Sequence, residues 1–369
     1  MRNVLMLLAL CLALAFAPVG NAAEREIVAR TEVTKWGQLP QAFEISGQAL
    51  PEGVKASDFT ITGEATGWGA STLHPFSCEV DSVEADGDGW RLAPKQFPDK
   101  YFYVRKMEVR CAGHDELGFD LEDITRTVTP VADDFERYED PSAQLSAHVF
   151  LPQADEPVPV VIVFHGYGDT NNLLTYRTAI PWAEPEFQAA HPCAVIAPVI
   201  PDAVYISEFV RDGICEGVLR WIDVQADAGK IDAKRVYAMG NSFGGMTAIE
   251  MAEQHPDRIA AVLALCPALN YSAHGIQRLA ALAGTPVTIA QAEHDETIPV
   301  RVGRDAAAAI EAAGNPSVTL RIYTDDEMNA AGARLGSGER YSFHHVELAA
   351  MEPPEFDRYA KWLFEQEKP

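Results

Sequence analysis

The second half of the chain alternates between short apolar runs and segments in which apolar residues recur at helical spacing. Near-continuous apolar runs bounded by polar residues are typical of strands that are buried on both faces of a sheet. The predicted strands are 158–164, 194–199, 235–239, 261–265, 287–290 and 318–323, and the predicted helices are 207–226, a segment that ends at 254, 306–313 and 355–365. Strands that alternate with helices in this way predict an α/β fold whose mostly parallel sheet is flanked by helices.

The first part of the chain has a different pattern, in which short alternating or β-branched runs are separated by glycine-rich turns. Runs such as 59–62 and 101–104 are typical of strands, and 86–89 is typical of a turn. This pattern predicts a small all-β, sandwich-like domain over 23–130, followed by the α/β domain over 131–369. Two roles stay open for the first domain, which are packing against the second domain and binding of carbohydrate or substrate.

The first 22 residues have the pattern of a cleaved signal peptide. Arg2 precedes a short apolar run over 4–16, and Gly20-Asn21-Ala22 offers small residues for cleavage. The run is shorter than the roughly 20 residues that span a bilayer. We therefore expect an exported protein, either periplasmic or extracellular.

Composition and charge narrow the range of partners. The chain has 369 residues, of which 47% are hydrophobic and 22% charged, as in a folded globular protein. Its 29 Lys and Arg against 54 Asp and Glu give a net charge of −25. Such a surface repels phosphate backbones and anionic membranes, so we expect neither a nucleic acid partner nor stable membrane insertion. The sequence leaves the oligomeric state open.

The cysteines that follow the signal peptide are odd in number: Cys78, Cys111, Cys193, Cys215 and Cys266. At least one thiol would then stay unpaired in an oxidising compartment. Cys78 and Cys111 are the favoured pair because both lie in the β-rich part of the chain. No cysteine or histidine spacing is typical of zinc, and no glycine-rich loop has a phosphate-binding pattern, so no metal and no cofactor are expected.

The pattern Gly240-x-Ser242-x-Gly244 lies between a predicted strand and a predicted helix. In that context a serine sits on a strained turn and serves as a nucleophile. The two glycines suit the turn because it brings the backbone so close to its neighbours that a Cβ atom would not fit. Ser242 is therefore the predicted nucleophile, against the plainer interpretation of an ordinary strand-to-helix loop.

A serine hydroxyl is a weak nucleophile and needs a base that is itself oriented by a carboxylate. In this topology the acid follows the serine along the chain, and the histidine follows the acid. Asp295, which comes soon after the predicted strand 287–290, is the predicted acid, and Asp325 or Asp326 is the fallback.

Two adjacent histidines, His344 and His345, stand between the last predicted strand and the last predicted helix, where the base is expected. Adjacent side chains point in different directions, so only one of them can face Ser242. His345 is preferred because Leu348 then follows one helical turn later as a packing residue. His344 is kept as the alternative base.

The loop His165-Gly166-Tyr167-Gly168 follows the first buried strand of the α/β domain. Such a loop donates one backbone amide to the oxyanion hole, and the residue after the nucleophile donates the other. We therefore predict that the amides of Tyr167 and Phe243 stabilise the tetrahedral intermediate, while His165 braces the loop.

These motifs resemble the α/β-hydrolases, and specifically the secreted esterases and predicted peptidases related to polyhydroxybutyrate depolymerases and feruloyl esterases. The resemblance covers about 135–364, some two thirds of the chain. Besides the Ser242 and His165 motifs, it rests on Pro181-Trp182-Ala183-Glu184-Pro185, Ile231-Asp232 and His255-Pro256-Asp257. It implies ester hydrolysis, and some members carry an immunoglobulin-like domain ahead of the catalytic one.

The chain departs from that group at two places. Phe343-His344-His345 stands where related enzymes often have a single histidine after a small residue. The segment 325–341 is longer than the usual connection, which predicts a flap over the site.

The leading hypothesis is a secreted serine carboxylesterase that forms an acyl-enzyme with a small-molecule or polymeric ester. About twenty residues separate the strands that end at 265 and begin at 287, which leaves no room for a large helical cap. A peptidase or acyltransferase on the same triad is the second hypothesis, and a non-catalytic binding protein on a hydrolase fold is the third. Since the base must be neutral, activity should rise between about pH 6 and 7.

Overall fold

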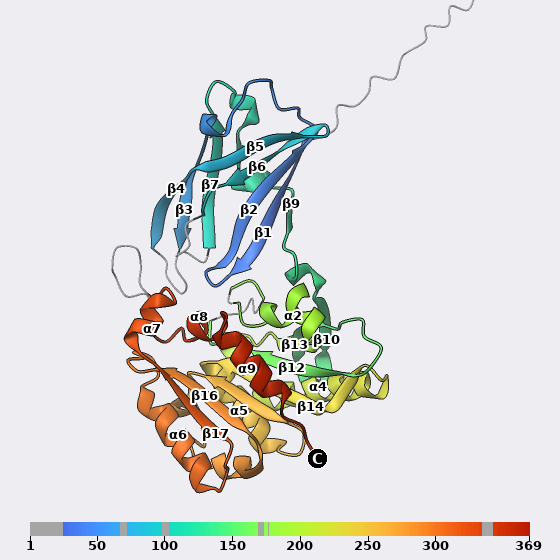
Figure 1. Cartoon of the computed structure of the whole chain (residues 1–369), viewed down its shortest axis with the longest axis vertical. Coiled ribbons are helices and arrows are strands. Elements are labelled where there is room, and N and C mark those ends of the chain that lie inside the picture. The colour runs from blue at the N-terminus through green and yellow to red at the C-terminus, as the bar shows by residue number, and fades with distance from the viewer. Residues whose placement is uncertain (1–24, 67–71, 98–102, 169–172, 176, 334–341) are drawn as a thin grey trace, which may run out of the picture.

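A computed structural model describes residues 25–66, 72–97, 103–168, 173–175, 177–333 and 342–369 of the chain. It has two domains, a β-sandwich and a larger α/β domain, and the second contains the C-terminus (Figure 1). The predicted signal peptide, and residues 334–341 of the predicted flap, lie outside the described residues.

The first domain consists of two β-sheets that enclose one hydrophobic core. One sheet has the order β5-β6-β2-β1-β9 and the other β4-β3-β7-β8. The strands are β1 (Glu26–Thr34), β2 (Gly37–Ser46), β3 (Phe59–Thr66), β4 (Leu73–Cys78), β5 (Val80–Asp86), β6 (Gly89–Pro94), β7 (Tyr103–Cys111), β8 (Phe119–Asp120) and β9 (Arg126–Val128). Short 3-10 turns are η1 (Ala56–Asp58), η2 (Asp115–Leu117) and η3 (Leu121–Asp123). Residues from both sheets, such as Phe43 and Ile61, fill the core. The predicted sandwich-like domain is confirmed.

The favoured disulfide between Cys78 and Cys111 is wrong, because the structure places the two residues on strands that do not touch. Cys78 on β4 is paired with Ile61, and Cys111 on β7 is paired with Phe59, so that β3 lies between them. Two strand spacings amount to about 9–10 Å, whereas a disulfide needs Cα atoms within about 7 Å. The five described cysteines are all free and buried.

The second domain is built on a sheet of eight described strands in the order β10-β11-β13-β12-β14-β15-β16-β17. Their bounds are β10 (Glu136–Asp140), β11 (Leu145–Phe150), β12 (Val158–Phe164), β13 (Ala194–Pro198), β14 (Ile231–Asn241), β15 (Ala261–Leu265), β16 (Val287–Ala292) and β17 (Val318–Tyr323). β10 and β11 are antiparallel, and all strands from β13 to β17 across the sheet pair in parallel. The six predicted strands are confirmed as β12 to β17.

Helices cover both faces of this sheet (Figure 1). The long ones are α4 (Glu208–Asp227), α5 (Phe243–Gln254), α6 (Val300–Ala312) and α9 (Glu355–Phe364); the short ones are α1 (Ile180–Ala183), α2 (Pro185–Ala190), α3 (Asp202–Tyr205), α7 (Asp325–Ala330) and α8 (Glu347–Ala350). 3-10 turns are η4 (Ala132–Asp134), η5 (Pro141–Ala143), η6 (Leu269–Tyr271) and η7 (Leu279–Gly284). Apolar residues of α4, α5 and α6 pack on one face, and those of α1 and α9 pack on the other. The predicted α/β architecture is confirmed.

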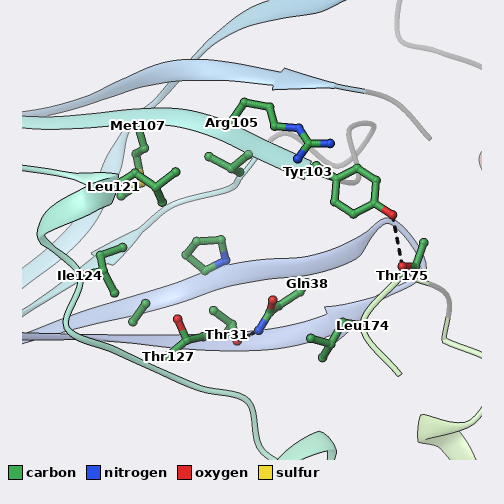
Figure 2. Close-up of a pocket in the computed structure, with 13 residues that line it drawn as sticks. Thr31, Gln38, Tyr103, Arg105, Met107, Leu121, Ile124, Thr127, Leu174 and Thr175 are labelled. Atoms are coloured by element: carbon green, nitrogen blue, oxygen red, sulfur yellow. Dashed lines mark hydrogen bonds between the residues drawn. The ribbon is translucent and has the colours of Figure 1, made fainter. Parts of the chain in front are cut away.

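The segment between β9 and β10 connects the two domains, and the predicted boundary at residue 130 lies in this segment. A cavity of about 250 Å³ lies where the open end of the sandwich faces the second domain. There the hydroxyl groups of Tyr103 and Thr175 lie 3.3 Å apart across the domain boundary (Figure 2). Among the described residues, none of the helices has the length and apolar character needed to cross a membrane.

Candidate active site

Ser242 lies on a sharp turn between β14 and α5. Its backbone has φ 55° and ψ −118°, a conformation that L-residues adopt only when the surrounding structure enforces it. A Cβ at Gly240 would lie 2.5 Å from the Phe164 carbonyl oxygen, and one at Gly244 would lie 2.1 Å from the same atom. The turn therefore needs glycine on both sides, as the motif predicts.

Asp295 lies shortly after β16, at the same edge of the sheet as Ser242. Its side chain is buried, and Oδ1 accepts hydrogen bonds of 2.8 Å from the backbone N–H groups of Thr297 and Ile298. These two donors hold the carboxylate in one orientation.

His344 connects the serine to the aspartate. Its Nε2 lies 2.9 Å from Ser242 Oγ, and its Nδ1 lies 2.9 Å from Asp295 Oδ2 and 3.1 Å from Oδ1. An ionised carboxylate only accepts, so Nδ1 carries the proton and Nε2 is free to accept the hydroxyl proton of Ser242. Such an arrangement can activate a serine hydroxyl as a nucleophile.

The structure corrects the preference for His345. His344 rather than His345 bridges Ser242 and Asp295, and His345 Nδ1 pairs at 2.9 Å with Glu347 Oε1, both side chains being buried. His345 was preferred on the assumption that Leu348 follows one helical turn later. The segment around the two histidines is not helical, however, and α8 begins only at Glu347. Leu348 does pack, but against the core of the first domain.

The protonation of His344 is set by opposing influences. Burial lowers its pKa, while the Cys266 sulfur and the Asp295 carboxylate raise it, and the net pKa lies above the usual value. Burial also raises the pKa of the Cys266 thiol, which is therefore neutral near pH 7. The Asp295 carboxylate is thus the group that stabilises a charged imidazole.

The two predicted oxyanion-hole residues, Tyr167 and Phe243, lie close to Ser242. A Cβ at Gly166 would lie 3.6 Å from Ser242 Cβ, so the loop with Tyr167 runs directly beside the serine. Phe243 follows Ser242 at the start of α5, and its ring lies 5.4 Å from that of Tyr167. Within the described part of the chain, neither the Tyr167 nor the Phe243 amide donates to an acceptor. Both predicted donors are brought together beside Ser242.

His165 holds this loop in place. Its Nε2 accepts a 2.8 Å hydrogen bond from the Ile200 amide, its Nδ1 donates to the Gly166 carbonyl at 2.7 Å, and the Tyr205 hydroxyl donates to its carbonyl oxygen. Burial lowers the pKa of His165 to about 4, so the ring is neutral and both nitrogens are occupied. The geometry agrees with a brace and leaves the ring no proton to exchange with substrate.

A cavity of about 400 Å³ opens onto Ser242 and His344. Among the described residues that line it there is no Asp, Glu, Lys or Arg, and Tyr167, Ile206, Phe243 and Tyr271 form apolar walls. Tyr167, Ile206 and Tyr271 are 45%, 69% and 60% exposed, so the cavity has an apolar rim. The Phe243 ring lies within 5.5 Å of both tyrosine rings and links the two walls.

The alternative acids lie elsewhere. Asp325 pairs at 2.8 Å with the exposed His294, and Asp326 lies in the first turn of α7. Neither contacts His344, which is bound to Asp295.

Sequence reasoning missed two neighbours of the site. Cys266 directs its thiol at the His344 carbonyl oxygen, 3.2 Å away. Its position just after β15 was the available signal, because strand ends meet at this edge of the sheet. Tyr271 lies in the loop after β15 and had no motif to reveal it.

Among the described residues, Cys266, Asp295 and His344 form the one group of possible metal ligands, with ligand atoms within 4.8 Å of one another. The His344 and Asp295 atoms in that group already hydrogen-bond to each other. A metal ion would have to break that bond, so the arrangement fits a proton relay better than a resident metal.

The comparisons with known proteins concern the fold and the family. Residues 205–337 match the phospholipase/carboxylesterase family. The crystal structure of a thermostable esterase is 20% identical to the chain with a TM-score of 0.71, over 93% of this chain and 99% of that one. The chain has the α/β-hydrolase fold. Because the match spans nearly all of both chains, the likeness includes the β-sandwich as well as the α/β-hydrolase domain.

Other solved structures match a smaller share of the chain. A thermophilic esterase from Thermogutta terrifontis is 18% identical over 64% of this chain and 92% of that one, with a TM-score of 0.44. The acylaminoacyl peptidase of Pyrococcus horikoshii is 12% identical over 62% of this chain and 41% of that one, also with a TM-score of 0.44. No curated protein matches the chain in sequence. The resemblance to α/β-hydrolases is confirmed, and the narrower group stays a prediction.

Proposed function

We propose that this α/β-hydrolase is a serine carboxylesterase. The observation that carries the proposal is the continuous hydrogen-bonded chain from Ser242 Oγ through His344 to Asp295, in a cavity with two unused amides. The match to the phospholipase/carboxylesterase family supports the same class of reaction.

Acylation would begin when His344 Nε2 takes the proton of Ser242 as Oγ attacks the ester carbonyl. The carbonyl oxygen becomes negative, and the amides of Tyr167 and Phe243 stabilise it; one such donor is typically worth about 3 kcal/mol. Asp295 stabilises the imidazolium that forms. The imidazolium then gives its proton to the departing alkoxide, which leaves as an alcohol, and the acyl group remains on Ser242.

Deacylation would repeat these steps with water. His344 takes a proton from water, the resulting nucleophile attacks the acyl-enzyme, and the proton returns to Ser242 as the carboxylic acid leaves. The reaction needs no group that the chain itself does not supply.

The walls of the cavity favour a neutral, apolar substrate. The described residues of the lining include no Asp, Glu, Lys or Arg that could pair with a charged ester, and the aromatic rings of Tyr167, Phe243 and Tyr271 offer apolar area. We therefore propose an uncharged ester with an aliphatic or aromatic group as substrate.

Hydrolysis of a series of nitrophenyl esters by the purified chain tests this function. We expect turnover of neutral acyl esters, weaker turnover of esters with a charged acyl group, and loss of turnover in Ser242→Ala. Ser272→Ala is the matched control, since that hydroxyl donates to Glu250 and lies outside the cavity lining. Turnover of peptide anilides but not of esters would instead support the peptidase hypothesis.

We also propose that the protein is exported, on the basis of the signal-peptide pattern in residues 1–22. Intact mass of the protein expressed with its own first residues would show removal of that segment. A cell-associated product that retains Met1 and Arg2 would contradict export.

A further inference from the structure

The hairpin formed by β1 and β2 reaches out of the sandwich toward the segment that carries His344 (Figure 1). Its tip consists of Lys35 and Trp36, between the end of β1 at Thr34 and the start of β2 at Gly37. Trp36 is 6% exposed although it stands at the tip of a hairpin. The ring belongs to the buried cluster that fills the sandwich, and Gly332 of the second domain also lies against it.

The first contact of the tip lies just after α7. Lys35 Nζ donates a 2.9 Å hydrogen bond to the Ala331 carbonyl. At Gly332 a Cβ would lie 2.7 Å from the Trp36 ring, so the ring packs directly on the backbone there. Gly332 also has φ 99°, and its amide closes the end of α7 on the Asn329 carbonyl.

The second contact lies just after the histidines. Leu348 on α8 is 1% exposed and belongs to the buried cluster that fills the sandwich, together with Trp36. It is the one fully buried member of that cluster from the second domain, within the described residues. Ala331 packs against the same cluster from its edge.

His344 therefore lies between two points, at 331–332 and at 348, that the first domain holds in place. No helix or strand covers the described histidine segment itself, since α8 begins only at Glu347. Within the second domain it is held by Cys266 at the His344 carbonyl, Ser342 at the His344 amide and Glu296 at the Phe343 amide, and its Phe343 and Val346 side chains are buried. A displacement of about 1 Å in a reacting group can reduce a rate by about a hundredfold.

We infer that Trp36 is a positioning residue, through which the β-sandwich holds His344 in register with Ser242 and Asp295. The inference rests on the proposed function, because it assigns His344 as the base. It gives the first domain a part in the reaction without contact to substrate.

Steady-state kinetics of full-length variants test the inference. In Trp36→Ala we expect kcat to fall about 10- to 100-fold, and KM for a small nitrophenyl ester to stay within about twofold of wild type. The rate of Ser242 labelling by a fluorophosphonate should fall in parallel with kcat. Trp36→Phe keeps an apolar ring at the tip and should restore most of the activity.

Val109→Ala is the matched control, because Val109 lies in the same buried cluster but on β7 rather than on the hairpin. We expect it to lower the stability of the sandwich and to leave kcat unchanged. If Trp36→Ala does not fold, Leu348→Ala changes the same buried cluster from the side of the second domain and should lower kcat in the same way.

The results separate the inference from the function on which it rests. An inactive, unlabelled wild type would overturn the proposed esterase. An active wild type together with a folded Trp36→Ala of unchanged kcat would overturn the inference alone. An equal loss of kcat in Val109→Ala would also overturn it, since general destabilisation would then account for the effect.

Discussion

Ser242 carries strain that its neighbours impose. Its positive φ would relax in a flexible loop, but the preceding strand, the following helix and the flanking glycines leave the turn no other path. The residue pattern alone predicted this site, because only glycine fits beside the Phe164 carbonyl. The pattern did not decide between His344 and His345. The two residues lie in a segment that is neither helix nor strand, so no regular spacing predicts which side chain points toward Ser242.

The acid can be tested at the level of one atom. Asp295→Asn keeps the size of the side chain but removes the charge that stabilises imidazolium, so we expect kcat to fall by about 10³- to 10⁴-fold. Asp325→Asn is the matched control, since that carboxylate pairs with the exposed His294 and should leave kcat unchanged. Comparable losses in both variants, measured with one nitrophenyl ester, would remove Asp295 from the triad.

The dependence of activity on pH reports the base. Burial lowers the pKa of His344, whereas Cys266 and Asp295 raise it, and the net pKa lies above the usual 6.5. The neutral ring is the active form, so kcat/KM should rise with pH and reach half of its maximum above pH 6.5. Initial rates of ester hydrolysis, measured from pH 5 to 10, provide the profile. A half-maximum below pH 6.5, or a flat profile, would contradict the assignment.

At the scale of elements, hydrophobic runs located the strands well. β12, β15 and β17 begin and end at the predicted residues. β12 and β15 are buried at every position, which gives the unbroken apolar runs from which they were predicted, whereas β17 is a partly buried edge strand. α6 begins at Val300, six positions before the predicted helix, since its first turn is amphipathic rather than alanine-rich. The hairpin between β1 and β2 was not predicted to touch the second domain, as nothing in its local pattern marks a contact so distant in sequence.

The turn that carries Ser242 packs closely against the end of β12, so we expect any side chain at Gly244 to lower the stability of the fold. In Gly244→Ala the new Cβ would meet the Phe164 and His165 carbonyl oxygens at 2.1 and 2.6 Å, so we expect a loss of about 1–3 kcal/mol in unfolding free energy. Urea denaturation followed by circular dichroism measures the loss.

Gly284→Ala is the control for this change, because a Cβ there meets no atom within 4 Å. Its unfolding free energy should stay within about 0.5 kcal/mol of wild type. Equal stability of the two variants would mean that β12 and the turn are not packed as described.

At the scale of the whole molecule, the two domains are joined by more than a linker. The Trp36 and Leu348 contacts and the cavity near Tyr103 lie along one interface, and the thermostable esterase of similar fold matches over both domains. The α/β-hydrolase domain supplies the Ser242, His344 and Asp295 side chains, and the sandwich supplies support. The sequence patterns predicted the fold class of each domain, but they did not predict the interface between the two domains.

The absence of disulfides among the described cysteines is a testable property of the whole chain. All five lie buried and free, and strand order keeps Cys78 and Cys111 apart. Denatured mature protein, purified without reductant, should react with a thiol reagent at all five cysteines. The native protein should react slowly, because burial raises the pKa of each thiol. Three reactive thiols after denaturation would indicate one disulfide.

The most direct test of the account is the rate at which a fluorophosphonate labels Ser242 in wild type, His344→Ala and His345→Ala, with the labelled peptide identified by mass spectrometry. The account predicts rapid labelling at Ser242 in the wild type, loss of labelling in His344→Ala, and labelling in His345→Ala that is close to wild type. Loss of labelling in His345→Ala with retention in His344→Ala, or no labelling of the folded wild type, would contradict it.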